Sequence, residues 1–224
     1  MENAGYIALT RQSGLMREMR VIANNIANSV TSGYRQEGVV FSEYVTSVDG
    51  ASSLSMGQAN VRNTSLSQGT LTQTGGQFDF AIEGDGFFLV ETPAGQRLTR
   101  AGTFAPNAEG DLMTADGYQV LDAGGAPVFI PPGADDVSVS SDGTISSDGN
   151  PVGQIGLVQP VDPQGLIRED GVMFRADSGF EPAERGQILQ RFVENSNVNP
   201  ILQLTRLIEV QRAYELGASF LEAE

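Results

Sequence analysis

Apolar positions near the N-terminus recur at the spacing of one face of an α-helix; they include Leu9, Met16, Met19, Ala23, Ile26 and Val30. This spacing predicts a helix from about Ala4 to Ser29. Asn3 is its candidate N-cap, and Gly33 is the candidate residue at which the helix stops. The chain therefore opens with one long amphipathic helix.

The last two turns of this predicted helix are polar, because they contain Asn24, Asn25 and Asn28. Asparagine is a poor helix former, so local propensity does not explain these residues. An amide at the seam between helices costs stability but can fix the register of the helices. We therefore predict that these asparagines, with Asn197 and Asn199 near the other end of the chain, set the register between neighbouring subunits.

A second helix is predicted at the C-terminus, with Asn199 as its cap and Pro200 in its first turn. Its apolar residues cover about half of its circumference: Ile201, Leu204, Leu207, Ile208, Val210, Tyr214, Ala218 and Leu221. Further apolar residues lie off the main stripe of each helix, namely Ile7, Val21, Leu202, Leu216 and Phe220. A helix pair has no third layer to cover them, so we predict packing between subunits rather than an ordinary intramolecular pair alone.

In the middle of the chain, turn residues separate short apolar runs, a pattern typical of β structure. All ten prolines lie between Pro93 and Pro200, and strand-sized apolar runs alternate with Asp-Gly and Pro-Gly turns. The predicted fold is α+β: the long N- and C-terminal helices pair with each other as a coiled coil, and the middle of the chain forms an antiparallel sandwich or barrel-like domain. The expected divisions are 1–34 for the first helix, 35–80 for an extended polar connector that is partly β, 81–180 for the β domain and 181–224 for a joint and the last helix. Within the connector, residues 36–77 are either a linker or extended chain that orders against a neighbour, and we favour the second.

Two strands are predicted most clearly. Phe78, Phe80 and Ile82 alternate, Gly84–Gly86 has the chemistry of a tight turn, and Phe87–Val90 is a buried run. Period-two alternation before a glycine turn and a strand-sized apolar run after it predict a β-hairpin. Other predicted strands are Asn60–Arg62, Thr70–Thr72, Arg97–Phe104, Tyr118–Leu121, Val128–Ile130, Val137–Val139, Thr144–Ser146, Gly156–Gln159 and Val172–Arg175.

Composition narrows the possible functions. The 224 residues include no cysteine and no histidine, which removes thiol chemistry and the commonest metal ligand and general base. The formal net charge of −15 disfavours a nucleic-acid partner, because neutralising phosphates needs clustered basic side chains. No apolar run is long enough to span a membrane, and the N-terminus lacks the pattern of a cleaved secretory signal.

Candidate chemical sites are weak. Glu83 and Asp85 flank Gly84 and could be a hydrolase carboxylate pair, but a turn explains them better. The acidic loops near Asp111, Asp142 and Asp148 lack EF-hand spacing. Asn63 begins a short glycosylation-acceptor pattern that is common by chance. We predict no catalytic, cofactor-binding or metal-binding residue, and no enzymatic activity.

Four blocks of sequence, in order, resemble the axial proteins of the bacterial flagellum, the rod and hook proteins. They are Ala23–Arg35; Gly69–Leu71 with Phe78–Phe88; Thr99–Phe104 with Gly110–Leu112; and Val193–Asn199 with Gln211–Glu215. The blocks span nearly the whole chain, so the resemblance is far more specific than one short motif. Chain length and the Met-Glu-Asn opening are most similar to a proximal rod protein of this family.

The resemblance implies a structural subunit of the basal-body rod, the drive shaft that transmits torque. It implies export without a cleaved signal through the flagellar type III apparatus, and assembly in the periplasm. The implied partners are copies of itself, proximal rod subunits below and the distal rod protein above, with no cofactor and no insertion into a membrane. The expected assembly residues are Leu9, Met16, Met19, Ala23, Asn24, Asn25, Ile26, Asn28, Asn197, Asn199, Ile201, Leu204, Ile208, Gln211 and Tyr214.

Two alternatives come from other functional classes. The first is a secreted β-domain binding module with a helical oligomerisation stalk, which predicts a ligand cleft lined by exposed aromatic side chains. The second is an acid hydrolase, which predicts that Glu83→Gln abolishes turnover. The sequence contains no tryptophan, and its aromatic residues fall mostly in strand runs, so both alternatives are weaker than the rod protein.

Overall fold

The computed structural model describes residues 2–46, 54–134 and 136–222. The chain divides into two compact units. Unit 1 comprises Met1–Ser29, Gln36–Leu66 and Val198–Glu224, and unit 2 comprises Val30–Arg35 and Ser67–Asn197. The α+β class predicted from the sequence is confirmed, because helices occupy both ends and strands the middle.

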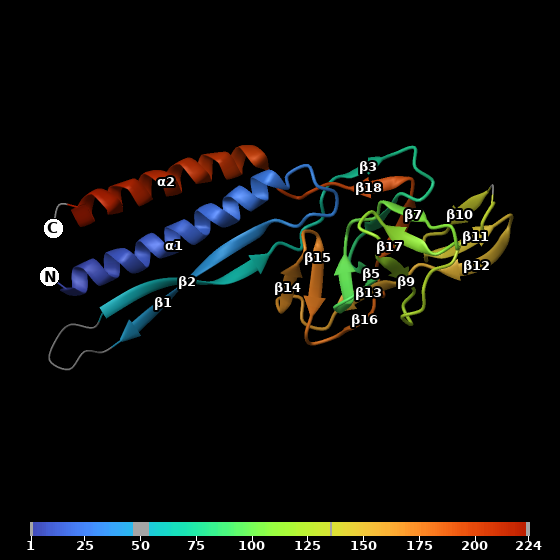
Figure 1. The fold of residues 1–224 in the computed structure, drawn as a ribbon, viewed down its shortest axis with the longest axis horizontal. Coiled ribbons are helices and arrows are strands. Elements are labelled where there is room, and N and C mark those ends of the chain that lie inside the picture. Colours follow the sequence, from blue (N-terminus) through green and yellow to red (C-terminus); the bar gives the residue numbers. More distant parts are fainter. Residues whose placement is uncertain (1, 47–53, 135, 223–224) are drawn as a thin grey trace. The chain divides into compact units, whose positions relative to one another are not determined.

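Unit 1 contains both helices and one hairpin. The helix α1 (Glu2–Ala27) packs against α2 (Pro200–Glu222) and against the hairpin of β1 (Glu37–Thr46) and β2 (Leu54–Thr64) (Figure 1). The strands pair antiparallel, from Glu37 opposite Thr64 to Thr46 opposite Leu54. Val21 and Ile22 of α1 and Val210 of α2 are buried. The side chains of Ile7, Phe220 and Leu221, which the sequence places on helix surfaces, lie outside the described part of the chain.

The start of α2 is as predicted. The Asn199 side-chain oxygen accepts hydrogen bonds from the amides of Ile201 (3.1 Å) and Leu202 (3.2 Å). These are two of the donors that a helix N-terminus leaves without an intrahelical acceptor, so Asn199 is the N-cap. The end of α1 differs from the prediction, since the helix ends at Ala27 and the chain continues in turns to Gly33, whose φ is +73°.

Unit 2 contains β3 to β18, and all its ladders are antiparallel. A nine-stranded sheet has the order β14-β15-β6-β5-β9-β8-β7, with β13 pairing β5 and β16; β10-β11-β12, β17-β4 and β18-β3 form smaller sheets. The bounds are β3 Leu71–Gln73, β4 Phe80–Glu83, β5 Phe87–Thr92, β6 Gly95–Thr99, β7 Phe104–Pro106, β8 Leu112–Thr114, β9 Gln119–Leu121, β10 Val137–Val139, β11 Thr144–Ser147, β12 Asn150–Gln154, β13 Leu157–Pro160, β14 Leu166–Glu169, β15 Met173–Ala176, β16 Phe180–Pro182, β17 Gln187–Gln190 and β18 Phe192–Glu194.

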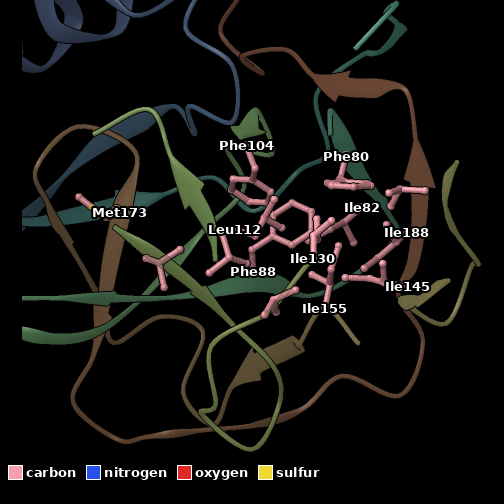
Figure 2. Close-up of a cluster of buried hydrophobic side chains, with 14 residues drawn as sticks. Phe80, Ile82, Phe88, Phe104, Leu112, Ile130, Ile145, Ile155, Met173 and Ile188 are labelled. Atoms are coloured by element: carbon pink, nitrogen blue, oxygen red, sulfur yellow. The ribbon is translucent and has the colours of Figure 1, made fainter. Parts of the chain in front are cut away.

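The core of unit 2 lies on both faces of β5. Phe88 and Val90 belong to the larger apolar cluster, while Phe87 and Leu89 belong to a second cluster on the opposite face. Successive side chains of a strand point to opposite faces, so an unbroken apolar run suits a strand that is covered on both sides. Figure 2 shows the larger cluster, with Ile188 beside side chains of β4.

The predicted hairpin of Phe78–Ile82 with Phe87–Val90 is wrong, although both strands exist. β4 pairs with β17, whereas β5 pairs with β6, β9 and β13. Gly84 and Gly86 both have positive φ, and they connect two different sheets rather than the two strands of one hairpin. The predicted run Arg97–Phe104 is likewise interrupted between β6 and β7.

Most of residues 36–64, which belong to the expected and partly β connector, form the β1–β2 hairpin. The sequence predicts extended chain that orders against a neighbour. Instead the segment pairs with itself and packs on α1 within unit 1. The divisions at residues 34, 80 and 180 stay predictions.

Candidate functional site

The predicted apolar stripe of α1 faces outward. Leu9, Met16 and Ala23 are exposed, while Met19 and Ile26 are half-buried. Large apolar side chains at this spacing on a helix surface are available for packing against another helix. The stripe therefore has no complete cover within the described part of unit 1.

The α2 surface is even more apolar. Its large side chains with exposed fractions between 45% and 75% are Ile201, Leu202, Leu204, Ile208 and Leu216. The side of α2 that packs on α1 is narrower and includes buried Val210 and half-buried Tyr214, whose carbonyl accepts a hydrogen bond from the Gln12 side chain (3.0 Å). Gln211 lies on the exposed surface and bonds to Glu215.

The side chain of Asn25 connects three elements of unit 1 by hydrogen bonds. Its side chain donates to the Glu37 carbonyl (2.7 Å) and accepts from the Glu37 amide (3.0 Å). It also donates to the Gln203 side chain of α2 (3.2 Å). One amide that is 1% exposed thus joins α1, the start of β1 and α2.

The other predicted register asparagines also have bonds inside the chain. Asn28 donates to the Asn24 carbonyl (2.9 Å), and Asn197 donates to the Ser67 carbonyl (2.8 Å). Asn199 caps α2. Asn24 is exposed, so among these residues its side chain is the best placed to meet another subunit.

An ion pair adds to the contact between α1 and α2. The Arg206 guanidinium lies 2.8 Å from the Glu18 carboxylate, and also contacts Glu209 at 3.2 Å. The hydrogen bond that Arg206 donates to the Glu18 carboxylate is the main cause that raises the pKa of Arg206. Arg206 is about half exposed, so this pair orients the helices more than it stabilises them.

A buried ionic junction lies in unit 2. The Glu194 carboxylate contacts the guanidinium of Arg35 at 2.8 Å and that of Arg100 at 3.0 Å. All three side chains are at most 4% exposed. The same carboxylate accepts a hydrogen bond from the Gly69 amide (2.8 Å). Four segments that are far apart in the sequence therefore meet at one carboxylate, and we call this set of four residues the Glu194 junction.

The Glu194 junction carries more positive than negative charge, since two arginines share one glutamate. Burial lowers the pKa of Arg35 to about 10, against the opposing attraction of Glu194. Burial also lowers the pKa of Arg100. Backbone carbonyls accept further hydrogen bonds from the two guanidinium groups: Arg35 donates to the Ser67 carbonyl, and Arg100 donates to the Gly84 carbonyl (2.7 Å). The charged state of both arginines thus depends strongly on Glu194.

Two glycines of the resembling blocks are required by close backbone approach. A Cβ at Gly33 would lie 2.2 Å from the Ala101 nitrogen, in a backbone conformation with positive φ. A Cβ at Gly69 would lie 1.9 Å from the Asn195 carbonyl oxygen. Side chains at these positions would separate the segments that the Glu194 junction joins.

Tyr34 is fixed beside the Glu194 junction by a third arginine. The Arg168 guanidinium lies over the Tyr34 ring (4.3 Å) and over the Phe174 ring (4.7 Å), and it donates to the Arg35 carbonyl. Stacking of a cation on two aromatic faces is favourable in a desolvated site. Residues 34 and 35 are therefore held by both their side chains and their backbone.

The sequence analysis did not single out Arg35, Arg100 or Glu194 as functional residues. Each lies in a block that resembles the flagellar family, so the blocks were the available signal. Glu83 and Asp85 of the proposed carboxylate pair are both exposed. Within the residues that the structure describes, no cluster of acidic side chains could hold a metal ion, and no helix is long and apolar enough to cross a membrane.

Three family models match the chain. The Flagella basal body rod protein model matches residues 6–35, the Flagellar hook protein FlgE/F/G D1 domain matches 81–147, and the Flagellar basal body rod FlgEFG protein C-terminal model matches 189–224. Arg35, Arg100 and Glu194 fall one in each model. The matches thus cover α1, much of unit 2 and α2.

Curated relatives match almost the full length. The chain is 39% identical to the flagellar basal-body rod protein FlgF of Caulobacter vibrioides, over 99% of this chain and 93% of the relative. It is also 39% identical to FlgF of Mesorhizobium japonicum, over 99% and 92%. The rod protein FlgG of Bacillus subtilis is 31% identical over 96% and 92%. From these full-length similarities and the three matching models, the chain belongs to the flagellar basal-body rod protein family, as an FlgF-like member.

Proposed function

We propose that this protein is a structural subunit that assembles through its terminal helices into the axial rod and transmits torque along it. In this proposal the subunit passes through the flagellar type III export apparatus without a cleaved signal and assembles in the periplasm. Its neighbours are copies of itself and other rod proteins, with proximal rod subunits below and the distal rod protein above. It acts mechanically rather than as an enzyme.

One observation carries the proposal: the exposed apolar surface of α2. Ile201, Leu204 and Ile208 are spaced for one helix face, and all are exposed in the isolated chain. Burying each such side chain in a contact contributes roughly 1.5–3 kcal/mol. Several contacts of this size in each subunit are enough for assembly, because a head-to-tail contact that does not close repeats along the structure.

The proposed contact pairs this α2 face with the outward stripe of α1 from a neighbouring subunit. Leu9, Met16 and Ala23 of that stripe are exposed and recur every seven residues, the spacing of a coiled-coil seam. Asn24 of α1 and Gln211 of α2 are exposed polar residues close in sequence to these faces. We assign to them the register role that the sequence suggested for the asparagines.

The decisive experiment is Leu204→Asp in a motile strain. A charge on the α2 face should prevent rod assembly and abolish swimming in soft agar, while the purified protein keeps its circular dichroism spectrum because Leu204 is exposed. The matched control is Val161→Asp, which places a charge at an exposed apolar position of unit 2 and should leave the strain motile. A motile Leu204→Asp strain with normal basal bodies would refute the proposal.

The binding-module alternative expects a cleft lined by exposed aromatic side chains. A hollow of about 240 Å³ lies beside the β5–β6 turn, but its aromatic residue is the half-buried Tyr118. Arg97 in its lining is already paired with Glu169 at 2.7 Å. This hollow gives the binding module little support.

A further inference from the structure

The chain passes between the two units at residues 29/30, 35/36, 66/67 and 197/198. Inside unit 2, the residues beside these crossings are bonded to one another. The Gly33 amide donates to the Glu194 carbonyl (2.8 Å), and the Asn197 amide donates to the Tyr34 carbonyl (3.3 Å). The Asn197 side chain donates to the Ser67 carbonyl (2.8 Å). The segments by which unit 2 is connected to unit 1 are therefore joined within unit 2.

Strand pairing links the same segments. β3 pairs with β18, and β4 pairs with β17, so strands early in unit 2 have ladder partners at its C-terminal end. Ile188 of β17 lies opposite Ile82 of β4, and both are buried in the larger apolar cluster (Figure 2). The nine-stranded sheet around β5 has separate ladders. Backbone hydrogen bonds connect it to the β4 region near β7, where the Phe104 amide donates to the Phe78 carbonyl (3.1 Å) and the Phe80 amide donates to the Gly102 carbonyl (2.8 Å).

The charges make separation of these segments an all-or-none event. If residues 192–197 detach, Arg35 and Arg100 lose the carboxylate that both contact. Two buried cations without a counter-charge are far more costly than a lost hydrogen bond. The segment of Arg35 must then also open to water, while Arg100, which directly follows β6, becomes exposed where it is. Residues 67–83 take part in the same opening, because the carbonyls of Ser67 and Ile82 accept hydrogen bonds from these two arginines. None of the segments 30–35, 67–83 and 192–197 can therefore leave alone at low cost.

We propose that the Glu194 junction is a latch: it holds residues 30–35, 67–83 and 187–197 together as one cooperative unit that opens separately from the sheet around β5. Opening would free the connections to both helices in a single step. Closing would fix them together. The latch is a property of the single chain, and the inference does not depend on the rod as the site of assembly.

The test is native-state hydrogen exchange on the full-length protein. In the unmodified chain, slow amides of the three latch segments should share one opening free energy, below that of β5 and β6. In Glu194→Gln, the exchange rates of amides in all the latch segments should rise together by about 100-fold or more, while their shared opening free energy stays below that of β5 and β6.

The matched control is Glu169→Gln. Glu169 also joins two arginines of unit 2, Arg97 and Arg175, but it is 30% exposed. Its substitution should leave exchange in the latch segments within about threefold of the unmodified chain. A control that opened the latch as strongly as Glu194→Gln would overturn the proposal.

A second variant keeps the test decisive if Glu194→Gln does not fold. Arg35→Met leaves a one-to-one pair between Arg100 and Glu194, so it should fold and open the same three segments to a smaller extent. One opening free energy shared by β5, β6 and the latch segments, in the unmodified chain or in either folded variant, would refute the latch. So would acceleration of one latch segment alone.

Discussion

At the scale of single residues, Glu194 and Asn25 resemble one another. Each is about 1% exposed, and each satisfies groups that come from distant segments. Glu194 neutralises cations in unit 2, and Asn25 completes backbone hydrogen bonds in unit 1. The difference in chemistry predicts different consequences of substitution.

We predict an asymmetry in the Glu194 junction. Glu194→Gln removes the one carboxylate that both buried arginines contact and should lower the free energy of unfolding of unit 2 by about 3–5 kcal/mol. Arg35→Met leaves Arg100 paired and should cost less, about 1–3 kcal/mol. Urea unfolding followed by near-ultraviolet circular dichroism measures both values. A larger loss in Arg35→Met than in Glu194→Gln would contradict this account of the charges.

The sequence could not reveal this role of Glu194, because its meaning depends on residues that are far away in the chain. A single acidic residue in a polar segment is ordinary, and only the fold brings Arg35 and Arg100 to it. The N-cap role of Asn199 was predictable, since its partners are the next two or three residues.

At the scale of elements, the hydrogen bonds by which Asn25 joins α1, β1 and α2 predict that its substitution destabilises unit 1. Asn25→Ala removes both bonds to Glu37, whose backbone groups are buried, and should lower stability by about 2–4 kcal/mol. Thermal unfolding followed at 222 nm measures this loss through α1 and α2.

Asn24→Ala is the neighbouring control for that measurement. Asn24 is exposed and alanine is the better helix former, so the free energy of unfolding should stay within about 0.5 kcal/mol of that of the unmodified chain or rise slightly. Equal losses of stability in Asn25→Ala and Asn24→Ala would show that the Asn25 hydrogen bonds do not hold α1, β1 and α2 together. Reduced motility in Asn24→Ala, with stability unchanged, would support its register role.

Element existence was more predictable than element pairing. The seven-residue repeat predicted α1 to within two residues, period-two alternation predicted β4, and an unbroken apolar run predicted β5. Their partners could not be read in the same way, because β4 pairs with a strand about a hundred residues later. A glycine turn between two strands is equally compatible with a hairpin and with a crossing between sheets.

At the scale of the whole molecule, two separate cores predict two unfolding transitions. Unit 1 leaves many large apolar side chains of α2 exposed, whereas unit 2 buries a cluster on each face of β5. In urea, the helical signal at 222 nm should therefore be lost before the near-ultraviolet signal of the aromatic core. Coincident transitions of the two signals would indicate a single cooperative unit instead.

Unit 1 draws on both ends of the chain, because α1 and α2 pack together although nearly the whole sequence lies between them. In the proposed assembly, the helix pair can form only after both ends of the chain have been exported. A chain interrupted partway cannot present a complete adhesive surface. In the proposed assembly, this topology therefore excludes chains in which either terminal helix is missing or unfolded.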